Sequence, residues 1–265
     1  MSVSLASISK GTALKAPRIF LGGTEGVGKS TLASQAPNPI FIPMQSEQGL
    51  DQIDTNKFPP ASSHAEVMES LRVLYQEDHD FQTVVIDSVS ALEPLVWKAV
   101  CAEHGVDGIE KVLGGFGKGY TESLKYWREL MTALDYLRDD KGMACILIGH
   151  VKTKEFADPE AESYTTYTMD LNEKAANAII RWADGVFFAN FKRAIVSTKD
   201  AGFGKSRGRG TSTGQRVVYT EKRAAHFGKN RYAMPYELPM SWSEIGKYFV
   251  RSTAGGKVGE PTPTT

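Results

Sequence analysis

One glycine-rich run that ends in a lysine and a serine carries the residue types that phosphate binding needs. Glycines let backbone N–H groups approach phosphate oxygens closely, the lysine neutralises the β- and γ-phosphates, and the serine hydroxyl binds Mg²⁺. The pattern G-x-x-x-x-G-K-[S/T] is matched by Gly23, Thr24, Glu25, Gly26, Val27, Gly28, Lys29 and Ser30. We therefore expect this run, extended to Thr31, to bind ATP and Mg²⁺, with Lys29 and Ser30 in the two roles just given.

The segments on both sides of this run have the patterns of a strand and a helix. Residues 18–22 (RIFLG) are mostly apolar, as in a buried strand, and residues 31–35 (TLASQ) predict the first turns of a helix. Phosphate-binding loops join a strand to a helix in this order. The alternative is a glycine turn that arose by chance, and this flanking context argues against it.

Four short apolar runs alternate with helical patterns along the chain. The runs cover residues 19–21, 40–42, 84–86 and 145–148, and short branched runs of this kind are typical of strands covered on both faces. Alternating strands and helices predict an α/β fold with a mostly parallel central sheet flanked by helices. The apolar residues at helical spacing are Val67, Leu71 and Tyr75, followed by Leu124, Trp127, Met131, Leu134 and Leu137.

A polar residue follows each of the later predicted strands, at the sheet edge where ligands of parallel sheets bind. We expect Asp87 to hold Mg²⁺ together with Ser30, the alternative being a residue that caps the next turn. Glu47 is the candidate to orient and deprotonate the attacking water, unless it is an ordinary solvated glutamate. His150 either hydrogen-bonds the γ-phosphate or is a histidine satisfied at a strand end.

Beyond residue 185 the pattern changes to short strands separated by turns. We predict strands at residues 186–189, 194–197 and 217–220, which adds antiparallel strands toward the C-terminus. Residues 241–244 (SWSE) match a capping box, which predicts a last short helix that ends at Tyr248.

The composition is that of a globular protein with no overall charge. The chain has 265 residues, with 31 Lys and Arg against 31 Asp and Glu, so any contact with nucleic acid requires local basic patches. Cys101 and Cys145 are far apart in sequence and are expected to be reduced and structural. No apolar segment is long enough to span a membrane, and we expect a cytoplasmic protein, in the host cytoplasm if phage-encoded.

The expected organisation is one domain between two variable ends. Residues 1–16 predict a flexible arm, residues 17–250 a single ATPase domain, and residues 251–265 a disordered tail rich in Gly, Pro and Thr.

Three segments resemble RecA-type recombinases. Residues 84–92 (VVIDSVSAL) look like their Walker B strand, and residues 42–47 (IPMQSE) resemble the strand that ends in their catalytic glutamate. Residues 229–231 (KNR) look like the Lys-Asn-Arg motif of RadA-like proteins. By motif order and size, the chain resembles the phage-encoded RecA-like ATPases that act as single-strand annealing proteins. It departs from RecA at His150, where RecA carries glutamine.

The resemblance implies that Lys229 and Arg231 reach the nucleotide of a neighbouring subunit. An added arginine is typically worth about 10³–10⁵ in the rate of phosphoryl transfer. Residues two apart on an extended segment point to the same side, so both cations could reach one phosphate. Action in trans implies self-association into a ring or a filament. The alternative is a basic turn before Pro235.

Three loops are candidates for contact with single-stranded DNA, because cations track phosphates and aromatic rings stack on bases. Within residues 110–120, the run 114–120 combines glycines with two aromatic residues and a lysine, and residues 151–168 carry lysines and aromatic residues among acidic ones. These two match, in order, the mobile DNA loops of RecA-like proteins. Residues 202–214 form the most basic loop, with Lys205, Arg207 and Arg209. A solvated loop is the alternative for each.

The favoured function is an ATPase that assembles on single-stranded DNA and promotes annealing or strand exchange in phage recombination, with hydrolysis stimulated by DNA. A phage single-strand binding protein is a candidate partner. One alternative is a P-loop small-molecule kinase, with residues 205–209 as its lid. Another is a nucleotide-gated loader that hydrolyses ATP slowly or not at all.

Overall fold

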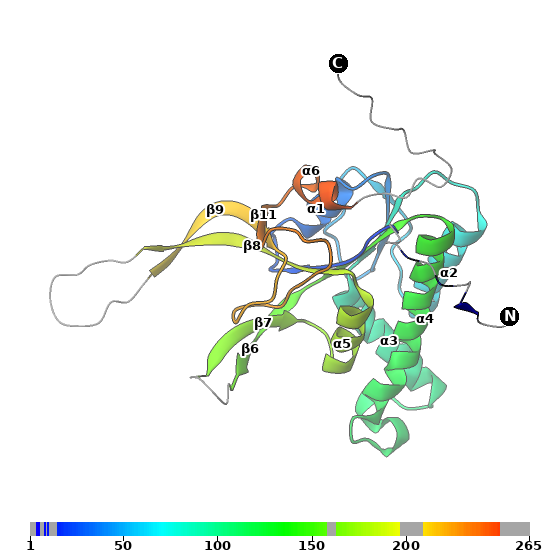
Figure 1. Ribbon diagram of the computed structural model, residues 1–265. Coiled ribbons are helices and arrows are strands. Elements are labelled where there is room, and N and C mark those ends of the chain that lie inside the picture. Colours follow the sequence, from blue (N-terminus) through cyan, green and yellow to red (C-terminus); the bar gives the residue numbers. More distant parts are fainter. Residues whose placement is uncertain are drawn as a thin grey trace.

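The computed structural model describes residues 15–157, 163–196 and 209–249, together with positions 4, 5, 8 and 10. The predicted tail and most of the predicted arm lie outside these residues. Within them, the chain forms a nine-stranded sheet and a separate two-stranded sheet (Figure 1). The strands of the large sheet are β1 (Arg18–Gly23), β2 (Pro39–Pro43), β3 (Asn56–Lys57), β4 (Thr83–Asp87), β5 (Ala144–Gly149), β8 (Gly185–Val196), β9 (Arg209–Tyr219), β10 (Lys229–Asn230) and β11 (Glu237–Pro239).

The centre of the large sheet is parallel, in the order β8, β1, β5, β4, β2. All four predicted core strands are present, as β1, β2, β4 and β5, and their apolar side chains are buried. β9 joins β8 antiparallel, and β11 continues this antiparallel part of the sheet. The predicted α/β class is therefore confirmed. Because the core strands are parallel, their carboxyl ends meet at one edge.

Helices cover both faces of the sheet. Four long ones share one face, namely α2 (His64–Gln76), α3 (Val89–Glu103), α4 (Lys118–Asp140) and α5 (Glu173–Trp182). The other face is covered by the short helices α1 (Lys29–Ser34) and α6 (Trp242–Ile245). Two 3₁₀ helices are also present, η2 (Ile109–Gly114) and η3 (Gly246–Tyr248).

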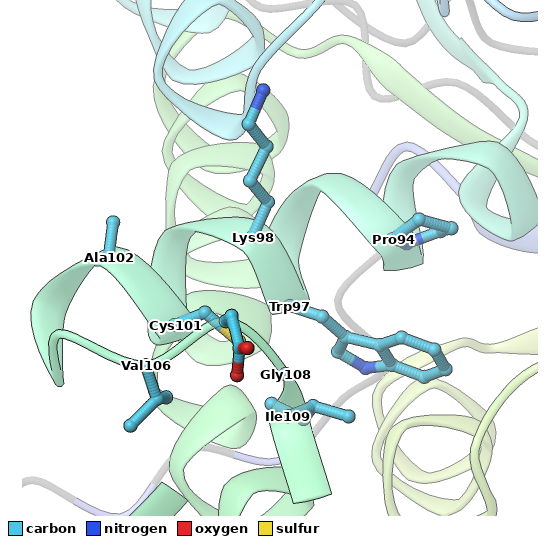
Figure 2. A pocket seen from close by; sticks show the side chains of 9 residues that line it. Pro94, Trp97, Lys98, Cys101, Ala102, Val106, Gly108 and Ile109 are labelled. Carbon is cyan, nitrogen blue, oxygen red and sulfur yellow. The ribbon is translucent and has the colours of Figure 1, made fainter. Parts of the chain in front are cut away.

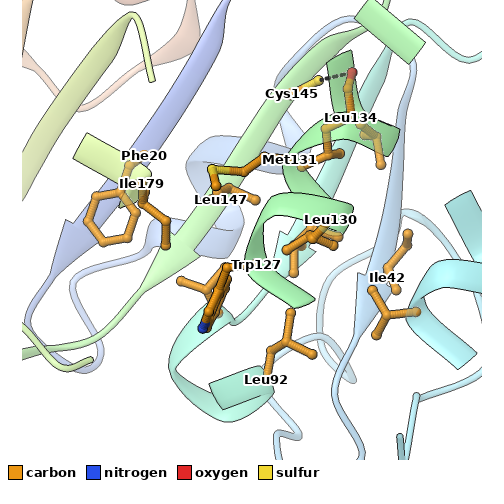
Figure 3. Packing of buried hydrophobic residues seen from close by; sticks show 14 of the residues in the cluster. Phe20, Ile42, Leu92, Trp127, Leu130, Met131, Leu134, Cys145, Leu147 and Ile179 are labelled. Atoms are coloured by element: carbon orange, nitrogen blue, oxygen red, sulfur yellow. Dashed lines mark hydrogen bonds between the residues drawn. The ribbon is translucent and has the colours of Figure 1, made fainter. Parts of the chain in front are cut away.

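Most of the predicted apolar stripe on α4 forms the core of the four-helix layer. Trp127, Leu134 and Leu137 are completely buried, and Figure 3 shows Trp127 and Leu134 packed over strands of the sheet. Burial of each such side chain contributes about 1.5–3 kcal/mol to folding. On α2, in contrast, the predicted Tyr75 is 41% exposed, and Leu74 takes the core position instead. The helical spacing is compatible with either residue in the buried position, and the packing of α2 against α4 places Leu74 there.

The predictions for the C-terminal region need one correction. Residues 186–189 and 194–197 were expected to form separate strands, but β8 is continuous over twelve residues. β1 pairs with residues 185–189 of β8 and β9 pairs with residues 188–196, so the two pairings overlap and no turn divides the strand. The predicted last helix is present as α6 and η3, although the Ser241 side chain makes no capping hydrogen bond to it.

Residues 151–156 and 164–169 form a β-hairpin that stands apart from the large sheet. Its strands are β6 (Val151–Phe156) and β7 (Tyr164–Met169) (Figure 1). The hairpin begins directly after His150, the residue that follows β5. No helix in the described residues is long and apolar enough to cross a membrane. Both cysteines are free, and Cys145 is buried in the core.

Candidate functional site

The glycine-rich run joins the end of β1 to the start of α1, at the carboxyl edge of the parallel strands. Gly26 and Gly28 have φ angles of 68° and 99°, in the region that only glycine enters freely. At Gly23 a β-carbon would lie 2.5 Å from the backbone oxygen of Ala189. The glycines are therefore required by the local backbone and by the close approach of β8. Val27, by contrast, is completely buried in the core.

Lys29 points into this loop. Its Nζ donates hydrogen bonds to the carbonyl oxygens of Gly23 (2.9 Å) and Thr24 (3.1 Å), and the residue is only 7% exposed. Burial lowers the pKa of Lys29, although Asp87 and Glu47 act in the opposite direction. The ammonium group is thus held where the loop would present it to a phosphate.

Ser30 and Asp87 meet across the edge of the sheet. The Ser30 hydroxyl donates a 2.6 Å hydrogen bond to the Asp87 carboxylate. Burial raises the pKa of Asp87, and the hydrogen bond from Ser30 partly opposes this rise. Ser88, not Asp87, caps the next helix, α3, so the capping alternative for Asp87 is not what the structure contains. Two adjacent oxygens suit Mg²⁺, which keeps several of its own waters and takes few protein ligands.

Glu47 lies at the centre of a second polar group at the same edge. Its Oε1 accepts hydrogen bonds from Ser88 and from His150 Nε2, the latter at 3.1 Å. Burial would raise the pKa of Glu47, but these two hydrogen bonds outweigh it and lower the pKa. The hydrogen bond to Glu47 in turn raises the pKa of His150. The backbone N–H of His150 also donates a 2.9 Å hydrogen bond to the Ser90 hydroxyl, which holds the main chain of His150 beside the start of α3.

These groups line one open cavity of about 320 Å³. The structure therefore brings the phosphate loop, both carboxylates and the histidine together, as the sequence predicts for a nucleotide site. Three further residues line the cavity, namely Gly49, Ile53 and Arg216 of β9, and none of them was singled out by its sequence pattern. The predicted residues that line the cavity are Glu25, Gly26, Gly28, Lys29, Ser30, Thr31, Glu47, Asp87 and His150.

Lys229 and Arg231 do not line this cavity. Lys229 pairs with Val186 near the start of β8, three residues or about 10 Å along the strand from the level of the phosphate loop. Its Nζ donates to the carbonyl oxygens of Ile180 and Ala183, both at 2.6 Å, at the C-terminus of α5. Burial lowers the pKa of Lys229, and the nearby Arg231 lowers it further. Lys229 thus caps a helix of its own chain.

Arg231 belongs to a cluster of cations around one carboxylate. Its Nη1 lies 2.9 Å from Asp184, which also bonds Arg18 and Arg138. Burial opposes ionisation of Asp184, but these arginines overcome it and lower its pKa. The Asp184 side chain is 9% exposed, whereas that of Arg231 is 55% exposed. Arg231 is therefore accessible from outside the chain while Arg18 and Arg138 hold Asp184 without it.

The three candidate DNA loops differ in structure. Residues 110–120 cover most of η2, a glycine-rich turn and the start of α4, with Phe116 99% exposed. In the second segment, residues 151–156 and 164–168 belong to β6 and β7, so the expectation of a loop was wrong over both strands, and residues 158–162 lie outside the described residues. In the third segment, residues 202–208 lie outside the described residues, and residues 209–214 belong to β9.

A second cavity, of about 450 Å³, lies between α3 and η2 (Figure 2). Pro94, Trp97 and Lys98 of α3 line one side of it, and Ile109 of η2 lies opposite. The Trp97 ring packs edge-on against Tyr120, with 5.4 Å between centroids. Tyr120 therefore anchors the base of segment 110–120, which leaves Phe116 as its exposed aromatic residue.

Comparison with known proteins gives three similarities. The sequence profile of a family described as AAA domain matches residues 15–232. The SPbeta prophage-derived uncharacterized protein YorG of Bacillus subtilis (strain 168) is 24% identical over 147 residues, which is 54% of this chain and 43% of that relative. The crystal structure of the RadB recombinase superposes with a TM-score of 0.42 at 13% identity, covering 77% of this chain and 81% of RadB.

Proposed function

The chain belongs to this AAA domain family, and we propose that it binds and hydrolyses ATP and acts on single-stranded DNA in phage recombination. The observation that carries the proposal is the convergence of Lys29, Ser30, Asp87 and Glu47 on one cavity at the carboxyl edge of the sheet. Lys29 and Ser30 begin α1, whereas Asp87 ends β4 and Glu47 follows β2, so only the folded sheet brings the four residues together. A solvated loop would not need to bury Lys29 and Asp87 to 7% and 5% exposure.

Each residue of the site has a distinct task in this proposal. The backbone N–H groups of the phosphate loop and Lys29 bind the phosphates, for which Lys29 exchanges its contacts with the Gly23 and Thr24 carbonyls. Ser30 and Asp87 would hold Mg²⁺, whose positive charge would stabilise the negative charge on the phosphates during transfer of the γ-phosphoryl group to water. Glu47 is kept ionised by the hydrogen bonds from Ser88 and His150, so it can orient a water and accept its proton.

His150 connects the nucleotide site to the β6–β7 hairpin, which is the proposed DNA-binding element. It contacts Glu47 through its ring, and the next residue along the chain, Val151, begins the β6–β7 hairpin. At the far end of that hairpin, Phe156 is 45% exposed and pairs with Tyr164 at 5.3 Å between ring centroids. Exposed aromatic rings beside lysines are suited to stacking on bases. A phosphate that alters the Glu47–His150 contact would therefore alter the base of a DNA-binding hairpin.

Completion of the site in trans is part of the proposal. Lys229 and Arg231 lie away from the cavity of their own chain, and Arg231 is the more accessible of the two. A head-to-tail assembly would place this surface against the nucleotide of the next subunit. In that assembly Arg231 would exchange Asp184 for a phosphate, while Arg18 and Arg138 keep Asp184 paired.

The experiment that tests this function measures ATP hydrolysis with and without single-stranded DNA over a series of salt concentrations. We expect DNA to stimulate hydrolysis at low salt. The logarithm of the DNA affinity should fall linearly with the logarithm of salt concentration, by about 0.7 per neutralised phosphate. Hydrolysis that is insensitive to DNA at low salt contradicts the recombination function. Tight ATP binding without turnover identifies a nucleotide-gated loader instead.

A further inference from the structure

Arg216 on β9 lies in the cavity of the phosphate loop, although it is 186 positions after Ser30 in sequence. We propose that Arg216 is a second cation of the nucleotide site, supplied by the same chain, that binds the phosphates of ATP. This inference rests on the proposed nucleotide site and assigns a further binding residue to it.

The pairing register explains how β9 reaches the phosphate loop. β1 ends at Gly23, which lies beside Ala189 of β8. β8 continues beyond this level, and its Phe191 pairs with Arg216 of β9. Arg216 therefore lies two residues past the carboxyl end of β1, at the height where the glycine-rich loop turns toward α1.

The alternation of side chains along β9 explains why Arg216 faces the loop. Val218, two residues further on, points to the same face of the strand. It packs in the core cluster that also contains Val27 of the loop and Leu32 of α1. Arg216 continues this face past the end of the apolar core, where its side chain is exposed.

Two distances give the position of the guanidinium group. One terminal nitrogen, Nη1, lies 3.0 Å from the point where a β-carbon on Gly28 would be. The central carbon of the guanidinium lies 5.9 Å from the centre of the Phe191 ring, so the ring supports the side chain from the neighbouring strand. The guanidinium group of Arg216 thus lies beside Gly28, the residue that precedes Lys29.

The charges of the cavity favour a phosphate as the partner of Arg216. Glu25, Glu47 and Asp87 contribute three carboxylates to the lining, while Lys29 and Arg216 are its lysine and its arginine. ATP would add several negative charges to this lining. A guanidinium matches two phosphate oxygens at once, and it remains charged in a partly buried site. Arg216 would therefore offset part of the negative charge of ATP and of the three carboxylates, which Lys29 alone does not neutralise.

The test measures equilibrium dissociation constants of the full chain for ATP and for inorganic tripolyphosphate, which has the phosphates but no base or ribose. We expect Arg216→Ala to weaken binding of both ligands by about tenfold to a hundredfold, as for the loss of one charge-assisted hydrogen-bonded group. Arg216→Lys should bind with intermediate affinity. Arg128→Ala is the matched control, because it removes an exposed arginine from α4 and should leave both constants unchanged.

The two ligands separate the possible results. Equal weakening for ATP and tripolyphosphate supports the inference. Weakening for ATP alone means that Arg216 contacts the base or ribose and overturns it, and so does unchanged binding of both. Thermal melting of Arg216→Ala and Arg216→Gln shows that lost affinity is not lost folding. A wild-type chain that binds neither ligand overturns the nucleotide site itself, whereas binding that needs Lys29 but not Arg216 overturns this inference alone.

Discussion

Asp87 and Glu47 are both carboxylates near Lys29, yet their surroundings move their pKa values in opposite directions. Burial dominates at Asp87 and raises its pKa. At Glu47 the hydrogen bonds from His150 and Ser88 overcome burial and lower it. A nearby cation stabilises the ionised form of a buried carboxylate most strongly. A carboxylate that is already ionised and hydrogen-bonded can accept a hydrogen bond from a water and then its proton. The two residues are therefore suited to the separate tasks of binding Mg²⁺ and positioning the nucleophile.

Substitution Glu47→Gln tests the second of these tasks. Glutamine keeps an oxygen that can accept from Ser88 and His150, but it cannot accept a proton from water. We predict that ATP hydrolysis falls by about 10²–10⁴, the usual contribution of a general base, while the dissociation constant for ATP changes little. Turnover and binding assays on the same preparation measure both quantities.

The matched control is Glu129→Gln, which neutralises an exposed carboxylate on α4 that does not line the cavity. Its rate should remain near that of the wild type. If Glu47→Gln hydrolyses ATP as fast as Glu129→Gln, the catalytic role of Glu47 is wrong.

At the scale of elements, the individual strands and the phosphate loop could be predicted from local sequence patterns, whereas the pairing between distant strands could not. The phosphate loop and the core strands depend on short sequence signals, and all four predicted core strands are present. The position of Arg216 depends instead on a register between β8 and β9, which no local pattern encodes. For the same reason the continuous β8 was divided into two short strands. The sequence therefore predicted the loop of the site but missed the residue that faces it.

Glu93 links helices α3 and α5 by hydrogen bonds and makes the stability of the fold sensitive to pH. It is a buried residue of α3 whose two carboxylate oxygens accept the backbone N–H of Asn172, the N-cap of α5, at 2.9 Å. Burial raises its pKa from 4.5 to about 7, although the Asn172 hydrogen bond opposes this rise. A carboxyl with a raised pKa binds its proton more tightly in the folded chain, so the folded state loses stability as the pH rises through this interval.

Substitution Glu93→Gln should remove this loss. We predict that the wild-type free energy of unfolding falls by up to about 3 kcal/mol more than that of Glu93→Gln between pH 4.5 and pH 7. Denaturant unfolding at a series of pH values measures the difference. Parallel pH profiles for the two proteins would mean that Glu93 does not titrate in this interval.

At the scale of the whole molecule, the candidate site is divided between two regions of the sheet. The phosphate loop, Asp87 and Glu47 share the carboxyl edge, whereas Lys229 and Arg231 lie near the amino end of β8. A residue that acts in trans must lie away from the site of its own chain, so this separation is what a head-to-tail assembly requires. The Lys-Asn-Arg motif was visible in the sequence, but its present contacts with the end of α5 and with Asp184 were not.

Mixing two inactive variants tests the division of the site between subunits. Glu47→Gln lacks the proposed base and Arg231→Ala lacks the proposed trans cation, so we predict that each variant alone is nearly inactive. In an equal mixture, one interface in four joins an intact Glu47 to an intact Arg231, and we predict recovery of roughly a quarter of the wild-type rate. A mixture that stays as inactive as its components would place Arg231 outside the neighbouring site. Arg231→Ala should remain folded because Arg18 and Arg138 still pair Asp184.

The most direct test of the account is the rate of ATP hydrolysis by the wild type and by Lys29→Ala, measured side by side under conditions where both chains are folded. Lys29 is the buried cation at the centre of the proposed site. The account predicts that the wild type hydrolyses ATP and that the substitution lowers the rate by at least about 10²–10³. Equal rates for the two proteins would contradict it.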